Sequence, residues 1–475
     1  MNEPVLIILV NSLALVLTVC FSLWISRRTR TAEGWSVGGR SLPLAVVVLT
    51  QFATASGGGM LVAQVGLGYQ FGWGAVTYGV FTAGGVLALL FLARWLRRHD
   101  FVSLPDIIKK IYGGHRVLMT VVTLMTMVVP FGWLCTQLVA FANLFHQLTG
   151  VNSTALTVAF AIVGLLFVLP GGMTSVAWSD AVFGAFMLIM AFVVGFYALH
   201  AAGGWPEVAA AATPARAGWE GFVAPGLLTI GLWAMSLTPG TMTNQMYFQR
   251  IYAANTLRTV VVSLIGTAAL LLGTKVYASV LGMSAFALNP RLGNPEDAAG
   301  TIIAGMPLIL SVAYSAFICQ TLLSTVTSAV QSVVVNITQD IYKNYTARDV
   351  TSREILRLSR ILSAVVLAAA LVLSLAFPSA LDWIVSSYAY SAVGLFFPVF
   401  LGFALRRTDL VGPYTGIAGV VAGVLAAGIA HALDTGVPYV AYGLAASAAA
   451  MLITGRLTRS RPRPGEHAPQ AETAG

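Results

Sequence analysis

A cluster of side-chain hydroxyls inside an apolar stretch is the first feature of this sequence that indicates chemistry. Residues 320–328 read Gln-Thr-Leu-Leu-Ser-Thr-Val-Thr-Ser, which places five hydroxyls in nine residues. Ser324, Thr327 and Ser328 stand at i, i+3 and i+4, so a helix would present them on one face. Neutral oxygens gathered inside a membrane helix suit a hard cation better than they suit lipid. The pattern therefore predicts a site for a small cation that drives the movement of something else.

Two ionisable residues within or beside apolar stretches each allow two interpretations. Asp180 comes just before an expected helix at 181–200, where it could cap the helix or help a cation enter or leave. Lys275 is the only basic residue placed well inside an apolar stretch. Its ammonium could snorkel toward the outer surface, or it could hold a substrate carboxylate. The sequence leaves both pairs of alternatives open.

Polar and aromatic residues on other apolar stretches are candidate substrate contacts. Each alone is more often a helix–helix hydrogen bond than a ligand contact. They are Gln64, Trp133, Asn244, Tyr247 and Ser386. No Walker motif, metal-binding Cys/His spacing or catalytic triad order appears, so neither an enzyme nor an ATP-driven pump is indicated.

Composition assigns the chain to the all-α integral membrane proteins. Hydrophobic residues make up 57% of the 475 residues and charged residues 9%, and the mean hydropathy is +0.83. Apolar stretches of about 20 residues are long enough to cross a bilayer as helices. We expect about thirteen, near 4–26, 43–68, 72–95, 115–145, 154–170, 181–200, 224–244, 256–283, 306–336, 360–377, 381–405, 412–433 and 437–455.

Basic residues predict the orientation of these helices. With the N-terminus outside and the C-terminus inside, 23 of the 26 lysines and arginines, Arg250 among them, fall in loops on the inner face. The net charge of +9 then needs no nucleic-acid partner, and the expected surroundings are lipid in the inner (plasma) membrane. We expect a single transporter domain over 1–460 that functions as a monomer. A disordered cytoplasmic tail is expected at 461–475.

Two expected helices carry breaks in their middles. Three successive glycines at 57–59 interrupt the second helix, and Pro239-Gly240 within Ser236–Thr241 interrupts the seventh. The two helices lie five apart, so 43–200 and 224–405 form two inverted five-helix repeats, with extra helices at 4–26 and 412–455. Transporters of this kind bind substrate and ions beside the breaks. Glycines that only let helices pack closely are the competing interpretation.

Several motifs along the chain resemble those of the sodium:solute symporter family, which includes bacterial proline, pantothenate, sialic acid and sugar transporters. The resemblance covers roughly residues 4–455. The motifs are Gly38-Gly39-Arg40-Ser41-Leu42-Pro43, the glycine break, Gly171-Gly172-Met173, Trp178-Ser179-Asp180, Gln249-Arg250, Ala253-Ala254, Ser324-Thr325 and Asp340-Ile341-Tyr342-Lys343.

The resemblance implies a leucine-transporter-like fold and a set of Na⁺ ligands. A first site would use the carbonyls of Ala55, Gly58 and Thr321 with the hydroxyls of Ser324 and Thr325. The chain departs from the family at Thr321, where alanine is usual, and at Gly58, where a larger apolar residue is usual. A second site, present in some members, would use Asp180, Ser324, Thr327 and Ser328. The sugar-transporting members also place an Asn and a Lys where Asn244 and, less closely, Lys275 stand.

These observations together predict a symporter that imports a small organic solute with Na⁺ as the coupling ion. A carboxylate, an amino acid or a similar metabolite would suit the polar candidates, as would a polyol. Proton coupling is the alternative within transport, and a membrane solute sensor is the alternative from another class. Hydroxyls and carbonyls favour Na⁺, because protons need a titratable relay.

Overall fold

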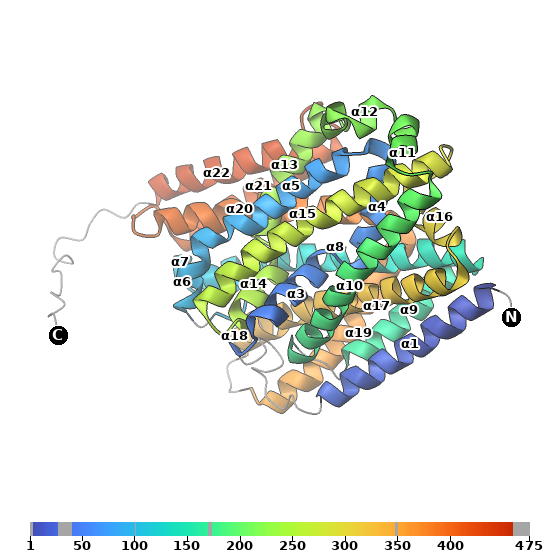
Figure 1. Ribbon diagram of the computed structural model, residues 1–475. Helices are drawn as coiled ribbons and strands as arrows, with labels where there is room; N and C mark the ends of the chain where they lie inside the picture. Colours follow the sequence, from blue (N-terminus) through green and yellow to red (C-terminus); the bar gives the residue numbers. More distant parts are fainter. Residues whose placement is uncertain (1–2, 27–39, 100, 170–172, 347–349, 459–475) are drawn as a thin grey trace, which may run out of the picture.

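The computed structural model describes residues 3–26, 40–99, 101–169, 173–346 and 350–458. Regular structure in these ranges is helical, apart from a parallel bridge between Leu42 and Ala254. The long helices form one bundle, with α1 at one edge and α21 and α22 at the opposite edge (Figure 1). The main helices are α1 (Glu3–Ser26), α3 (Leu44–Ala55), α4 (Gly58–Phe71), α5 (Gly74–Ala88), α6 (Leu90–Arg97), α8 (Arg116–Thr149), α9 (Ser153–Val168), α10 (Met173–Ala201), α13 (Leu227–Met242), α14 (Gln245–Ala253), α15 (Leu257–Leu288), α17 (Leu308–Val335), α19 (Ser352–Ala376), α20 (Ala380–Leu405), α21 (Pro413–Ala432) and α22 (Tyr439–Leu457).

Short elements connect these helices. They are α7 (Leu104–Tyr112), α11 (Trp205–Ala212), α12 (Pro214–Ala217), η2 (Trp219–Val223), η3 (Pro295–Asp297), α16 (Ala298–Ala304), the π-helix η4 (Asn336–Tyr342) and α18 (Lys343–Tyr345). One of them ties two distant parts of the chain together, because Glu296 Oε1 accepts a hydrogen bond of 3.0 Å from Leu381 N at the start of α20.

Ten helices among the described residues are long and apolar enough to cross a membrane. The helices α3 and α9 are apolar but shorter, and α13 occupies a further expected range, 224–244. The all-α membrane class is therefore confirmed. Thirteen crossings, the outside N-terminus, the domain limits and the inverted repeat remain predictions, and the expected tail at 461–475 lies outside the described residues.

The break in the second expected helix lies where the glycines predicted it. Helix α3 ends at Ala55, α4 begins at Gly58, and Ser56 and Gly57 connect them. The amide of Gly59 donates to Gln137 Oε1 on α8 at 2.8 Å. A side chain from a neighbouring helix thus satisfies a backbone group that the break would otherwise leave without a partner.

The break in the seventh helix lies further along the chain than expected. Helix α13 continues through Pro239 and Gly240, and the interruption falls at Thr243 and Asn244. A Cβ on Gly240 would lie 2.6 Å from the Tyr388 carbonyl oxygen, so this glycine permits close packing on α20. Asn244 starts the new helix, since its Oδ1 accepts from Met246 N at 2.9 Å.

Helix α10 begins at Met173 rather than near 181, which changes the role of Asp180. The residue stands about two turns inside the helix and is fully buried. A residue at that position has no free N–H groups to cap, so the capping interpretation is wrong.

Candidate functional site

Asp180 is the centre of a buried polar cluster where α3, α10 and α17 meet. Its Oδ2 accepts hydrogen bonds from Thr50 Oγ1 at 2.8 Å and from Thr54 Oγ1 at 3.0 Å. Ser324 donates to Oδ1, and Ser328 Oγ lies 3.5 Å from Oδ2. Thr50 and Thr54, like Ser324 and Ser328, are four residues apart, so each helix contributes one face. The predicted hydroxyl face of α17 therefore points at a carboxylate.

Arg250 pairs with this carboxylate, and the sequence analysis missed that role. Its Nη2 lies 3.2 Å from Asp180 Oδ2, and both side chains are 0% exposed. Nη2 also donates to Ser328 Oγ at 2.9 Å and to Thr54 Oγ1, and Nη1 donates to Met246 O at 3.1 Å. Assigning Arg250 to an inner loop was wrong, because α14 continues the broken seventh helix and carries Arg250 into the bundle. The signal in the sequence is the motif Gln249-Arg250, which the resemblance singled out without giving Arg250 a role.

Four of the residues expected at the first Na⁺ site are buried beside the break. Thr321, Ser324 and Thr325 are each at most 2% exposed, and so is Ala55 at the end of α3. A Cβ on Gly57 would collide with the side chain of Thr325, so the break and α17 are in direct contact at this residue. Thr325 Oγ1 donates to the Thr321 carbonyl at 3.1 Å.

The groups expected to bind the ion are carbonyls, hydroxyls and a carboxylate, so all of the ligand atoms would be oxygens, which fits Na⁺. Ser324 belongs to both expected Na⁺ sites, and in the structure its hydroxyl points to Asp180. Ser328 also reaches Asp180, whereas the Thr327 hydroxyl donates to Leu323 O of its own helix at 2.8 Å. The structure thus brings Asp180, Ser324 and Ser328 together and leaves Thr327 bonded to backbone.

Three of the expected substrate contacts gather around Tyr388 on α20. The side chains of Trp133, Asn244 and Tyr247 lie close to its hydroxyl, and the rings of Trp133 and Tyr388 meet edge to face with centroids 6.0 Å apart. Among the described residues, Trp133 Nε1 and Asn244 Nδ2 are buried without a hydrogen-bond partner. Gln64 Nε2 and Oε1 on α4 are also buried without a hydrogen-bond partner among the described residues. Buried polar groups without a protein partner can bind a ligand or a water molecule.

Lys275 is buried in the bundle and does not reach the outer surface. It is 2% exposed, and its stem packs against Gly79 on α5. Nζ lies 5.9 Å from the ring centroid of Tyr78, which in turn lies near Tyr247 and Tyr388. The snorkelling interpretation is therefore wrong. The structure records no ion pair for Lys275 with any other residue that it describes.

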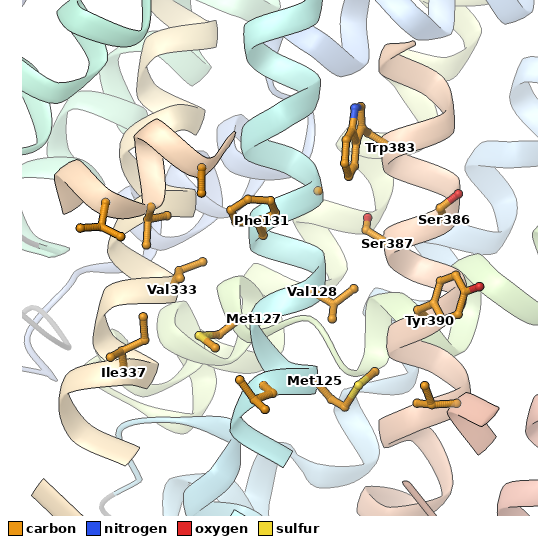
Figure 2. A pocket seen from close by; sticks show the side chains of 16 residues that line it. Met125, Met127, Val128, Phe131, Val333, Ile337, Trp383, Ser386, Ser387 and Tyr390 are labelled. Carbon is orange, nitrogen blue, oxygen red and sulfur yellow. The ribbon is translucent and has the colours of Figure 1, made fainter. Parts of the chain in front are cut away.

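Ser386 lies apart from these residues. It is half-buried and lines an apolar cavity of about 710 Å³ between α8, α17, α19, α20 and α21, together with Phe131 and Trp383 (Figure 2). Gly132 packs directly against Ser387 at one wall of this cavity. Trp133 and Tyr388, next to Gly132 and Ser387 in the sequence, belong to the group around the Tyr388 hydroxyl. Ser386 lines the apolar cavity instead, which makes it the least supported of the expected contacts.

Broken helices that border buried polar side chains in an all-helical membrane bundle define the class of multi-pass membrane transporters. The chain belongs to the sodium:solute symporter family, whose model matches residues 35–417. The members of this family and the similar proteins below are transporters and not enzymes.

One similar curated relative is the sodium/mannose cotransporter of Bos taurus, which is 26% identical over 212 residues. The match covers 42% of this chain and 34% of the relative, so the chain spans about a third of that protein's length. Among solved structures, a Na⁺-coupled sialic acid symporter in a substrate-bound, outward-open state is 18% identical with a TM-score of 0.81. That alignment covers 95% of this chain and 98% of the symporter.

MhsT in complex with L-phenylalanine is a second structural neighbour, 13% identical with a TM-score of 0.56. This alignment covers 88% of this chain and 99% of MhsT. The neighbours are leucine-transporter-like, which supports the expected fold class at that level.

Proposed function

We propose that this protein is a sodium-coupled symporter that imports a small organic solute across the inner (plasma) membrane by alternating access. The observation that carries the proposal is the contact between the α3–α4 break and Thr325, beside hydroxyls that surround a buried carboxylate. Membership of the sodium:solute symporter family supports Na⁺ as the coupling ion. The protein would function as a monomer, with its N-terminus outside.

The proposal includes two Na⁺ sites that share Ser324. The first uses carbonyls of Ala55, Gly58 and Thr321 with the hydroxyls of Ser324 and Thr325. The second uses Asp180 with hydroxyls of α17. Moving one charge through 100 mV supplies about 2.3 kcal/mol, so a second ion about doubles the driving energy for the solute.

The solute would bind among Gln64, Trp133, Asn244, Tyr247 and Lys275. Their unpaired amide and indole groups supply donors and acceptors, and Lys275 supplies a cation that has no carboxylate partner in the described structure. A carboxylate or an amino acid would provide that partner. We therefore favour an anionic or zwitterionic solute over a polyol.

Uptake by proteoliposomes tests this function. The protein is reconstituted and given a panel of labelled carboxylates, amino acids and polyols under an imposed inward Na⁺ gradient. We expect accumulation of at least one solute that disappears when K⁺ replaces Na⁺. Accumulation driven equally by a proton gradient without Na⁺ would favour the proton-coupled alternative, and solute binding without uptake would favour a sensor.

Alanine substitutions test the first Na⁺ site. We expect Ser324→Ala and Thr325→Ala each to raise the Na⁺ concentration for half-maximal uptake by about tenfold, because each removes one oxygen ligand that nothing else in the bundle replaces. Thr126→Ala on α8 is the matched control, since its buried hydroxyl donates to Val122 O of its own helix and belongs to neither proposed Na⁺ site. Unchanged Na⁺ dependence in both variants at normal expression would contradict the site.

Substitution of Lys275 tests the solute site. Lys275→Met keeps most of the buried stem but removes the ammonium, so we expect the KM for an anionic solute to rise by at least about a hundredfold. The Na⁺ dependence of uptake should change little, because the proposed Na⁺ ligands lie on other helices. Lys110→Met, at an exposed position on α7, is the control. A normal KM in Lys275→Met would exclude this contact and leave Gln64 and Asn244 as the principal donors.

A further inference from the structure

Arg250 occupies the side of Asp180 that a sodium ion would need. Its Nη2 lies 3.2 Å from Oδ2 and is also within hydrogen-bonding distance of Thr54 Oγ1 and Ser328 Oγ. These three oxygens are among those that could coordinate a cation at Asp180. Two of them, the oxygens of Asp180 and Ser328, are also ligands of the proposed second Na⁺ site.

Two cations cannot share these oxygens in a buried site at low cost. Charges a few ångströms apart repel strongly when water is excluded, and both partners here are 0% exposed. The hydroxyl oxygens are also limiting, because lone pairs that accept from Arg250 are not available to a metal ion. Binding of Na⁺ at Asp180 and pairing of Arg250 with Asp180 therefore exclude one another.

The guanidinium is incompletely bonded in its paired position, which makes it displaceable. Arg250 Nε is buried with no hydrogen-bond partner among the described residues. The rest of α14 is held independently, by a 2.6 Å hydrogen bond between Ser332 Oγ and Gln249 Oε1 and one of 2.7 Å from Leu104 N to Gln245 Oε1. The side chain of Arg250 can therefore move away while the helix stays attached.

We infer that Arg250 is a tethered cation that competes with Na⁺ for Asp180. The inference rests on the proposed second Na⁺ site and adds a positioning residue to it. When Na⁺ leaves, Arg250 returns to the carboxylate and keeps the cluster neutral, so the carrier can reorient without a buried net charge. When Na⁺ binds, the guanidinium is released from α3, α10 and α17, while the hydrogen bonds of Gln245 and Gln249 keep α14 attached. Ion occupancy is thereby coupled to the position of the Arg250 side chain.

The test measures Na⁺ binding to purified protein without solute. Unfolding temperature is followed during a Na⁺ titration at constant ionic strength, with K⁺ as the replacement ion. In Arg250→Gln we expect the Na⁺ concentration for the half-maximal shift to fall by on the order of tenfold, because the competing cation is gone. The total shift should also exceed that of the wild type, since the Na⁺-free variant holds an uncompensated carboxylate. The double variant Asp180→Asn with Arg250→Gln should lose both effects.

Arg250→Lys keeps a positive charge on α14, so it tests the inference even if Arg250→Gln does not fold. We expect its Na⁺ affinity to lie between those of the wild type and Arg250→Gln, because an ammonium offers fewer donors to the cluster. Na⁺ affinity that stays the same or falls in both variants would overturn the inference. If Na⁺ fails to stabilise even the wild type, while uptake is also independent of Na⁺, the proposed function itself fails.

Discussion

Replacing Asp180 by leucine should cost about 3–5 kcal/mol of stability, the usual cost of leaving one partner of a buried ion pair alone. Arg250 is 0% exposed, so its charge would remain inside the bundle with no carboxylate beside it. Thr50, Thr54 and Ser324 would lose their acceptor at the same time. Thermal unfolding in detergent without Na⁺ measures the loss, which should appear as a markedly lower unfolding temperature.

A double variant separates the cost of leaving Arg250 unpaired from the cost of changing the side-chain volume at position 180. Asp180→Leu combined with Arg250→Met removes both charges and fills similar volume, and such replacements of buried pairs are often neutral or stabilising. We expect the double variant to unfold at a higher temperature than Asp180→Leu alone. An unfolding temperature for Asp180→Leu within a degree or two of the wild type would mean that the pair is not buried in the membrane-embedded protein.

The sequence predicted those parts of the site that depend on local pattern. The spacing of Ser324 and Ser328 placed both hydroxyls on one face of a helix, and that face meets Asp180. The glycine run at 57–59 located the first break, because glycine weakens a helix wherever it occurs. Lys275 was singled out because a lysine inside a membrane helix is unusual in any fold.

The remaining features depend on contacts between distant segments. Pro239 and Gly240 suggest a break by themselves, but α13 continues through both, and Gly240 packs against Tyr388 on α20. The rule that basic residues gather in inner loops assigns Arg250 to such a loop. The structure instead places it on α14, which is buried in the bundle. Its partner Asp180 lies 70 residues away in the sequence. Both residues stand in motifs of the family, but no local pattern relates one motif to the other, so their pairing becomes visible only when the helices are placed against one another.

The largest loss of transport is expected from Gly57→Val. The glycine has a φ of −37°, so the obstacle is not backbone strain but the lack of room beside Thr325. A Cβ would collide with Thr325 Oγ1 and lie 3.0 Å from its Cβ, and valine adds two further methyl groups. The Thr325 side chain, whose hydroxyl donates to the Thr321 carbonyl, would be pushed out of the proposed first Na⁺ site. We expect Na⁺-dependent uptake by this variant to fall to background.

Gly57→Ala should give a graded version of the same effect. Overpacking costs about 1–3 kcal/mol, and each tenfold change in affinity corresponds to about 1.4 kcal/mol, so half-maximal uptake should need roughly 5- to 150-fold more Na⁺. Gly84→Ala on α5 is the matched control, because a Cβ there meets no atom within 4 Å. Adding Thr325→Ala to Gly57→Ala should cost less than the sum of the two single effects, since the smaller side chain relieves the collision. Fully additive effects would show that Gly57 acts through something other than its contact with Thr325.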